Sequence, residues 1–400
     1  MPTSPSPSSE VADEEVLSWL RLLGSRLEAR FLNVLLQHYG TPDEIRAASD
    51  EELGRKAALD AYRLRQLRAG PPPGELRNQL AAFRRHGMRL IPATAPDFPR
   101  NLFRMRTPPP AIFVKGTLAE EDALAVGIVG PREPTSYGTD VTKALCRDFA
   151  PTMTVVSGAA MGIDSVAHEE VLNHGGRTLA VLGCGIDVNY PARNEKLRER
   201  IVEEGSAILS VFSPGTPPRP GNFHSRNHVL AGLSSAVIVV EASRKSGALV
   251  TARAAAEEGR QVFAVPGDIN RRNSQGSNDL LRDGAALCTG AEDVLRELEG
   301  MLSAEVEILS RRQRMRSLKQ SGKAKARPED TEDSSAAVSD DSLERFVMER
   351  IGHSTIGFDD LAHLAEQRGH GIGALSEVLL VLELDGRIRQ EPGRLYSLAL

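Results

Sequence analysis

Short apolar runs alternate with segments of helical periodicity over the middle of the chain, from residue 124 onward. The apolar runs are LAVGIVG, MTVVSG, RTLAVLGCG, AILSVF, AVIVVEA, QVFAVPG and ALC. Continuous runs of this length are typical of parallel strands buried on both faces, and the segments between most of them predict helices. The alternation predicts a doubly wound α/β fold, whose mainly parallel sheet carries helices on both faces.

The first 75 residues carry a different pattern, with helical periodicity and very little strand character. Thr41 and Asp43 are typical helix-capping residues, and glycines that would end helices stand at Gly24, Gly40 and Gly54. We expect residues 1–75 to form a small helical domain of the SAM or helix-hairpin-helix type, behind a flexible Ser/Pro-rich leader that is not a signal peptide. Such domains contact DNA or other proteins, and a protein-interaction or spacing role is favoured here.

A PPPG break at residues 71–74 separates this domain from the core. One predicted helix, ELRNQLAAFRRHG, is followed by a proline-rich stretch that keeps apolar residues between its prolines. The stretch ends in AIFVKG, which predicts a strand that joins the main sheet. The core domain is therefore expected to span residues 76–300.

The composition changes again after Gly300. The segment RRQRMRSLKQSGKAKAR holds eight basic residues and no acidic one, and PEDTEDSSAAVSDD then reverses the sign. Residues 301–342 are too polar to bury a core, which predicts a disordered charged linker. Its basic half would either touch DNA nonspecifically or stay solvated.

Residues 343–400 predict three helices and a β-hairpin with a turn at Pro392 and Gly393, which is the pattern of a winged helix. A helix that reads the major groove carries Arg, Lys, Asn or Gln on its outer face. The third predicted helix instead carries Glu377, Glu383 and Asp385. This domain is therefore expected to bind protein or to self-associate.

Charge and cysteine content narrow the function classes. The formal net charge is −5, so binding to nucleic acid would depend on a local basic patch. The three cysteines lie far apart, without a Cys-x-x-Cys pair, so neither a disulfide framework nor a zinc site is indicated and a cytoplasmic location fits. No apolar run is long enough to span a membrane.

Two strand-to-helix turns in tandem, after LAVGIVG and after MTVVSG, form the centre of the predicted site. Helix N-termini carry unpaired N–H groups and a partial positive charge, so we expect an anionic ligand. The first turn reads Gly130, Pro131, Arg132, and the second strand ends at Ser157, without the glycine fingerprint and the acidic residue of a dinucleotide site. The Arg132 guanidinium suits a phosphate or the Hoogsteen edge of guanine, although a surface ion pair is the alternative.

The carboxyl ends of parallel strands meet at one edge of a sheet, so residues that follow the strands should gather there. The candidate DNA-binding residues at this edge are Arg132, Ser136, Gly162, Arg193, Asn194, Arg219, Phe223, Arg226, Asn227, Arg244 and Lys245. The cations among them are expected to converge on one rim. Phe223 stands among polar residues in a predicted long loop, SPGTPPRPGNFHSRNH, where exposure for base stacking is favoured over burial.

An enzymatic function is the alternative. Asp164, His168 and Glu241 follow strands and could act as acid–base groups. The structural interpretation is favoured, in which Asp164 caps a helix and His168 lies one turn later. The segment VPGDINRRNSQGS lacks the PGGxGT turn of nucleotide phosphoribohydrolases, and no Walker lysine motif is present. We therefore expect no catalytic residue, cofactor or metal.

Six motifs occur in order between residues 80 and 300: G-x-R…S-Y-G, SGxAxGID…AH, YPxxN, F-x-x-RN, SG-x-L-x-TA and VPG. Together they resemble the DNA-processing protein A family (DprA, also called Smf). The resemblance implies a Rossmann-like core that binds single-stranded DNA, homodimerises and loads the recombinase RecA during natural transformation. The core arginine of the family falls on Arg132, its loop aromatic on Phe223, and its Arg-Asn pair on Arg226 and Asn227.

The chain departs from the family pattern at two positions. Pro131 stands where the family usually has Ser, and His228 where it often has a second Arg. Both changes are expected to weaken phosphate contacts slightly. A winged helix at the C-terminal end is also frequent in the family, which agrees with the pattern of residues 343–400.

Overall fold

A computed structural model describes residues 7–298 and, near the C-terminus, residues 340–351, 356–366, 387–391 and 395–398, with a few single positions between these ranges. The chain divides into two compact units, Met1–Arg314 and Met315–Leu400. Nearly all of the predicted linker, residues 301–342, lies outside the described residues. Each unit is considered by itself below.

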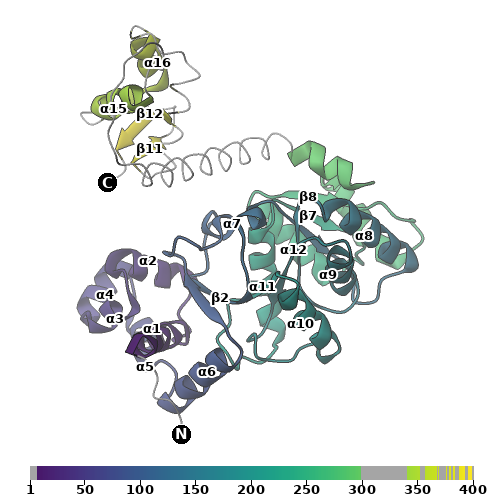
Figure 1. The fold of residues 1–400 in the computed structure, drawn as a ribbon, viewed down its shortest axis with the longest axis horizontal. Coiled ribbons are helices and arrows are strands. Elements are labelled where there is room, and N and C mark those ends of the chain that lie inside the picture. The colour runs from purple at the N-terminus through teal and green to yellow at the C-terminus, as the bar shows by residue number, and fades with distance from the viewer. Residues whose placement is uncertain are drawn as a thin grey trace, which may run out of the picture. The chain divides into compact units, whose positions relative to one another are not determined.

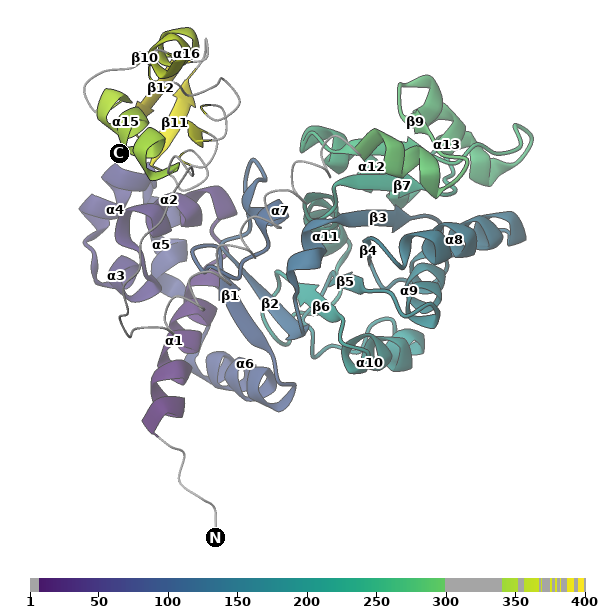
Figure 2. The same ribbon diagram turned by 45° about the horizontal axis from the view of Figure 1, so that its top comes forward.

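Within residues 7–298 the strands form a nine-stranded sheet, in the order β1-β2-β6-β5-β4-β3-β7-β8-β9. Figure 2 shows β7, β3, β4, β5 and β6 side by side in this order. The strands are β1 (Arg89–Pro92), β2 (Ala111–Gly116), β3 (Ala125–Val129), β4 (Thr154–Ser157), β5 (Thr178–Leu182), β6 (Ala207–Ser210), β7 (Ala236–Val239), β8 (Gln261–Ala264) and β9 (Ala286–Leu287). Neighbouring strands among β3 to β9 are parallel. Strand β1 is antiparallel to β2, and β2 is antiparallel to β6. The predicted α/β sheet is confirmed, and AIFVKG enters it as β2.

Helices cover both faces of the sheet, because alternate strand residues point to opposite sides. On β3, Val126 and Ile128 pack with α8 and α9, whereas Ala125 and Val129 pack with α11 and α12. The helices that follow the parallel strands are α8 (Ser136–Phe149), α9 (Ile163–Asn173), α10 (Glu195–Glu203), α11 (Pro220–Leu233), α12 (Gly247–Glu257) and α13 (Arg272–Arg282). No helix in the described part of the chain is both long and apolar enough to cross a membrane.

The strand order places a topological switch at β3. From β3 the chain steps through β4 and β5 to β6, and then crosses back over the sheet to β7, on the other side of β3. Ligands of open α/β sheets bind in the crevice outside the carboxyl ends of the strands at such a point. The turns after β3 and β4 therefore stand at the binding position that this fold favours.

The N-terminal residues form a cluster of helices beside β1, β2 and α6 (Figure 1). Its helices are α1 (Pro7–Leu23), α2 (Ala29–Tyr39), α3 (Pro42–Ala47), α4 (Asp50–Ala57) and α5 (Ala61–Ala69), and they are followed by α6 (Pro73–Arg85) and the short α7 (Arg100–Phe103). Two short 3₁₀ helices also occur within residues 7–298, η1 (Glu120–Ala123) and η2 (Ala192–Asn194). Thr41 caps α3 through a capping box with Glu44, as its sequence position predicts.

Gly54 does not end a helix, so the helix stop predicted there is wrong. Helix α4 continues through Gly54 to Ala57, because Leu53 and Ala57 are buried in the helical core and hold both ends of the last turn. The left-handed Ala58, with φ of 53°, ends the helix instead. Tertiary packing here outweighs the intrinsic cost of glycine in a helix.

The predicted loop before β7 is also partly helical. Helix α11 begins at Pro220, so Phe223, Arg226 and Asn227 stand on its first two turns and not in a loop. Proline is favoured at the first helical position, and Val229, Leu230 and Leu233 bury the later turns against the sheet. The Gly, Asn, His and Ser residues of the segment have weak helix propensity, which is why the sequence pattern indicated a loop.

The second unit has the elements of a winged helix, as predicted. They are α15 (Asp340–Ile351), β10 (Ile356–Gly357), α16 (Phe358–Glu366), β11 (Ile388–Glu391) and β12 (Leu395–Leu398), with the strand order β10-β12-β11. Helical positions of the third predicted helix, such as Leu375 and Leu379, are buried with Phe346 and Leu361. Glu377, Glu383 and Asp385 lie outside the described residues.

A buried histidine ties the turn after β4 to β5. The Thr178 hydroxyl donates to the Val155 carbonyl at 2.7 Å, so His168 Nδ1 donates to Thr178 Oγ1 at 2.6 Å. His168 Nε2 is then the acceptor for the Ala159 N–H at 3.3 Å. Burial, with a smaller contribution from the charge of Arg226, lowers the pKa of His168 to about 3. The ring is therefore neutral in the folded protein at physiological pH.

This histidine makes stability depend on pH. Below pH 6.5 the unfolded chain binds a proton that folded His168 rejects until about pH 3, so the free energy of unfolding falls as the pH drops through this window. Between pH 6.5 and 5 the loss attributable to His168 is roughly 2 kcal/mol. In the variant His168→Gln this part of the slope should disappear, as measured by urea unfolding at several pH values. His174→Gln, at the exposed end of α9, is the matched control variant. An unchanged slope in His168→Gln would contradict the assignment.

Candidate nucleic-acid interface

The two turns that follow β3 and β4 touch one another through their backbones. The Ile163 N–H donates to the Pro131 carbonyl at 3.2 Å. Gly162 has a φ of 80°, and a Cβ atom there would lie 2.3 Å from the Pro131 oxygen. A Cβ atom at Gly130 would lie 2.4 Å from the Ile163 side chain. Glycine is therefore required on both sides of this contact, and Gly162 acts through the backbone.

A small hollow opens beside the touching turns, with a volume of about 40 Å³. We call it the Phe223 hollow; its lining residues are Arg132, Gly158, Ala160, Met161, Leu182, Gly183, Cys184, Tyr190, Pro191 and Phe223. The half-buried Phe223 ring lies against Gly183, where a Cβ atom would be 2.8 Å from the ring. Its centroid lies 5.9 Å from that of Tyr190, with the two ring planes tilted by 49°. The hollow thus presents aromatic surface between glycine backbones.

Two guanidinium groups lie close to the Phe223 ring. The Cζ atoms of Arg132 and Arg226 each lie 5.8 Å from the ring centroid. Arg132 is exposed at the turn after β3, so its planar fork of donors is open to a ligand. Such an arrangement suits a phosphate oxygen pair beside a stacked planar group.

Arg226 differs from Arg132, because it is only 7% exposed. Its Nη1 donates to the carbonyls of Gly158 and Val181, the latter at 2.8 Å, and its Nε donates to Asn227 Oδ1 at 3.0 Å. Burial lowers the pKa of Arg226, and the negative charge of Asp164 counteracts this effect. The sequence predicts that Arg226 lies on the exposed rim. In the structure Arg226 is instead buried, and its hydrogen bonds link the ends of β4 and β5.

Asn194 is likewise engaged by the fold. Its Nδ2 donates to the carbonyls of Ala159 and Ala160, both at 3.0 Å, and to Ser165 Oγ at 2.9 Å. The side chain therefore holds the turn after β4 in shape. Ser136 is exposed on the first turn of α8, where its N-terminal helix position faces solvent.

The remaining predicted cations spread along the edge of the sheet. Arg193 is exposed in η2, Arg219 is exposed directly before α11, and Lys245 is exposed after β7. Arg244 Nε is paired with Asp279 Oδ2 of α13 at 2.8 Å, so this side chain is directed toward α13. The structure thus brings Arg132 and Arg226 close to Phe223, with Arg219 one turn before Phe223 at the N-cap of α11.

Each of the three candidate acid–base residues accepts a hydrogen bond from a backbone N–H group near the turns. Glu241 accepts from the Thr135 N–H at 3.0 Å and from the Thr135 hydroxyl at 2.6 Å, which fixes the start of α8. Asp164 accepts from the Ala160 N–H at 3.3 Å, so it stabilises the turn before α9 instead of capping the helix as predicted. Burial raises the pKa of Asp164, while Arg226 opposes the shift. Both nitrogens of His168 are occupied as described above.

Sequence reasoning missed Arg198. Arg198 is buried and donates to the carbonyls of Tyr190 and Pro191 at 3.2 and 3.0 Å. These two residues are joined by a cis peptide bond. Arg198 thereby positions Tyr190 against Phe223. The YP dipeptide marked the turn, but nothing local linked it to an arginine seven residues later.

Two family models match the chain. Residues 89–299 match DNA recombination-mediator protein A, and residues 329–394 match the DprA winged helix domain. Protein Smf of Synechocystis sp. is 35% identical over 323 residues, which are 76% of this chain and 78% of that protein. Protein Smf of Escherichia coli is 38% identical over 229 residues, which are 57% of this chain and 61%, less than two thirds, of that protein.

A solved structure agrees with these matches. DNA processing protein A (DprA) from Streptococcus pneumoniae superposes with a TM-score of 0.62 at 30% identity, over 70% of this chain and 97% of that one. The family model covers the whole parallel sheet, including both glycine turns and the Phe223 hollow. The chain therefore belongs to the DNA recombination-mediator protein A family, whose members are named DprA or Smf.

Proposed function

We propose that this chain is a recombination mediator without enzymatic activity that binds single-stranded DNA at the Phe223 hollow. The observation that carries the proposal is the proximity of two guanidiniums to the Phe223 ring at the carboxyl edge of the sheet. Single-strand binders combine positive charge with planar groups on which bases stack, at about 1–3 kcal/mol per base. The family membership supports the same class of function.

The geometry favours a single strand over a duplex. The hollow is small and bounded by backbone at Gly158 and Gly183, so a base reaches Phe223 only after leaving its stack. That step costs least in DNA that is already single-stranded. Arg132 then bonds the neighbouring phosphate, while the fixed charge of Arg226 raises the local positive potential.

The wider role follows from the resemblance to the family. We propose that the chain protects incoming single-stranded DNA, loads RecA during natural transformation, and acts as a cytoplasmic homodimer. We also retain the division into domains at residues 1–75, 76–300, 301–342 and 343–400. The occupied side chains of Asp164, His168 and Glu241 support the absence of catalysis over a phosphoribohydrolase-like activity.

Arg132→Ala should weaken binding of a labelled oligo(dT) by about 1–3 kcal/mol, because the variant lacks a fork of donors to phosphate or base. The log–log salt slope should fall by about 0.7 for each phosphate that the protein no longer neutralises. Fluorescence anisotropy at two salt concentrations measures both quantities. Arg55→Ala, exposed on α4, removes the same charge away from the hollow and should change little. Equal affinity for Arg132→Ala and wild type would remove the proposed site.

Phe223→Ala should weaken single-strand binding by about 1–3 kcal/mol while leaving the salt slope unchanged, since stacking on the ring is not electrostatic. Phe223→Trp should retain binding and report it by quenching of the indole fluorescence. A duplex of equal length is the comparison ligand, and the proposal requires that wild type prefers the single strand. If Phe223→Ala lowered duplex and single-strand affinity equally, stacking in the hollow would not be the source of selectivity.

Arg226→Ala should act mainly on stability. It leaves the buried Gly158 and Val181 carbonyls without their donor, which lowers the free energy of unfolding by roughly 2–4 kcal/mol. Arg132→Ala, an exposed change, should stay within about 0.5 kcal/mol of wild type. Urea unfolding of both variants separates the two roles. An Arg226→Ala protein of wild-type stability that no longer binds DNA would make Arg226 a direct DNA contact.

A further inference from the structure

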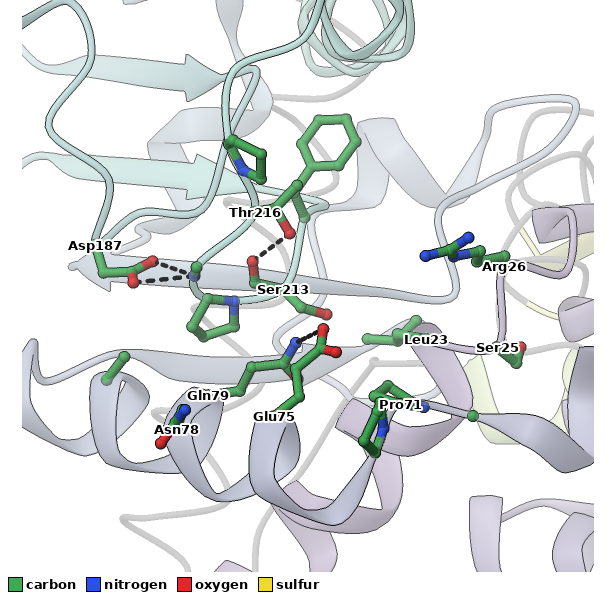
Figure 3. A pocket seen from close by; sticks show the side chains of 18 of the residues that line it. Leu23, Ser25, Arg26, Pro71, Glu75, Asn78, Gln79, Asp187, Ser213 and Thr216 are labelled. Carbon is green, nitrogen blue, oxygen red and sulfur yellow. Dashed lines mark hydrogen bonds between the residues drawn. The ribbon is translucent and has the colours of Figure 1, made fainter.

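A deep cleft of about 950 Å³ separates α6 from the loop that follows β6. Figure 3 shows Glu75, Asn78 and Gln79 of α6 along one wall, with Ser213 and Thr216 on the opposite wall. The remaining side is formed by the end of α1 and the segment between α5 and α6. We call this space the α6 cleft. No part of the function described above uses it.

The lining of the α6 cleft has three arginines and two carboxylates, so its formal charge is three minus two, or +1. The arginines are Arg26, Arg85 and Arg219; all three are exposed, and none forms an ion pair with another residue of the described part of the chain. The carboxylates accept hydrogen bonds within the fold: both oxygens of Asp187 from the Gly215 N–H at 2.9 Å, and Glu75 from Gln79 Nε2 at 3.2 Å. The arginines therefore keep their donors available to an anion.

The lining of the α6 cleft also offers apolar surface. Pro71, Pro72 and Phe212 line the cleft, and apolar side chains of this kind suit the face of a nucleobase. Gln79 is only 8% exposed, and its Oε1 atom, which has no hydrogen-bond partner in the described structure, is shielded from solvent.

The α6 cleft and the Phe223 hollow are bordered by neighbouring residues of the same segments. Arg219 lines the cleft and Phe223 lines the hollow, and the two residues are one turn apart at the start of α11. The segment after β5 also borders both spaces, since Asp187 lines the cleft and Tyr190 lines the hollow. Arg219 is therefore the cleft residue that stands within one helical turn of Phe223.

The other two arginines stand toward opposite ends of α6. Arg85 is the last residue of the helix, and Arg26 follows Gly24, whose Cβ position abuts Pro71 just before the helix begins. A helix of 13 residues is about 20 Å long, which exceeds the reach of a single nucleotide. The cations are thus spaced to contact phosphates that lie several nucleotides apart along one extended chain.

We propose that the α6 cleft binds a second segment of the same DNA single strand, adjacent to the nucleotide at Phe223. Arg219, Arg85 and Arg26 contact its phosphates, and a base packs on the apolar lining. This role rests on the proposed function of the hollow and extends it to the N-terminal helices. The position of Arg219 one turn from Phe223, together with the apolar lining, favours nucleic acid over an acidic peptide.

The test compares oligo(dT) of about 5 and about 20 nucleotides on the full chain, lengths that bracket short and long single-strand sites. The double variant Arg26→Gln/Arg85→Gln should bind the long oligonucleotide at least about fivefold more weakly and should lower its log–log salt slope by about 1.4, for two phosphates. Affinity for the short oligonucleotide should stay within about twofold of wild type, since the hollow is intact. The matched control is Arg55→Gln/Arg77→Gln, which removes two exposed arginines of α4 and α6 that do not line the cleft.

Photo-crosslinking provides a second readout. A long oligonucleotide that contains 4-thiothymidine should crosslink to peptides from residues 71–85 or 211–219, and these crosslinks should be absent in Arg26→Gln/Arg85→Gln. Wild-type affinity of that variant for the long oligonucleotide, or an equal loss of affinity in the control, would overturn the cleft proposal. If Arg132→Ala still weakened the short oligonucleotide, the proposed function would survive that result.

An acidic peptide is the competing occupant. A synthetic peptide of residues 328–341, PEDTEDSSAAVSDD, should bind wild type and Arg26→Gln/Arg85→Gln equally weakly. Peptide binding that disappears in the double variant, while the long oligonucleotide is unaffected, would make the cleft a peptide site and overturn the proposal. Failure of wild type to bind either oligonucleotide would instead refute the proposed function itself.

Discussion

The close contact between the turns after β3 and β4 is the constraint on which the candidate site depends. The Ile163 N–H bonds the Pro131 carbonyl, and the backbone of Gly162 lies where a side chain would collide with that oxygen. A residue with a Cβ at Gly162 or Gly130 would separate the turns. Since Arg132 follows one turn and Met161 belongs to the other, the same separation would open the hollow and move Arg132 away from Phe223.

Buried polar side chains hold these turns without sharing in the exposed surface. Asn194 and His168 bond the turn after β4, Glu241 bonds the segment before α8, and Arg226 bonds the ends of β4 and β5. A buried polar group is stable only when it is paired, so each of these residues is committed to its backbone partner. Arg132 is exposed and Phe223 is half-buried, so these two side chains remain available to a ligand.

The local gathering of arginines explains how a chain of negative net charge can offer a candidate site for a polyanion. The net charge of −5 is spread over the whole molecule, whereas Arg132 and Arg226 lie around one ring. At physiological salt, screening limits the reach of surface charge to about 8 Å, so the nearest groups dominate. The α6 cleft holds three further exposed arginines, Arg26, Arg85 and Arg219.

The sequence by itself determined the parallel sheet, its covering helices, the edge at which a ligand would bind, and the candidacy of Arg132 and Phe223. A strand that is buried on both faces of a sheet needs an apolar residue at nearly every position. It therefore appears as a continuous apolar run that can be recognised from the local sequence alone. Only the tertiary structure decided that Phe223 stands on a helix, that Arg226 is buried while Arg132 is free, and that Arg244 turns to Asp279. It alone brought Arg26, Arg85 and Arg219 to one cleft. The partner of a polar side chain is set by segments distant in the sequence, and no local periodicity encodes which of them will pack beside it.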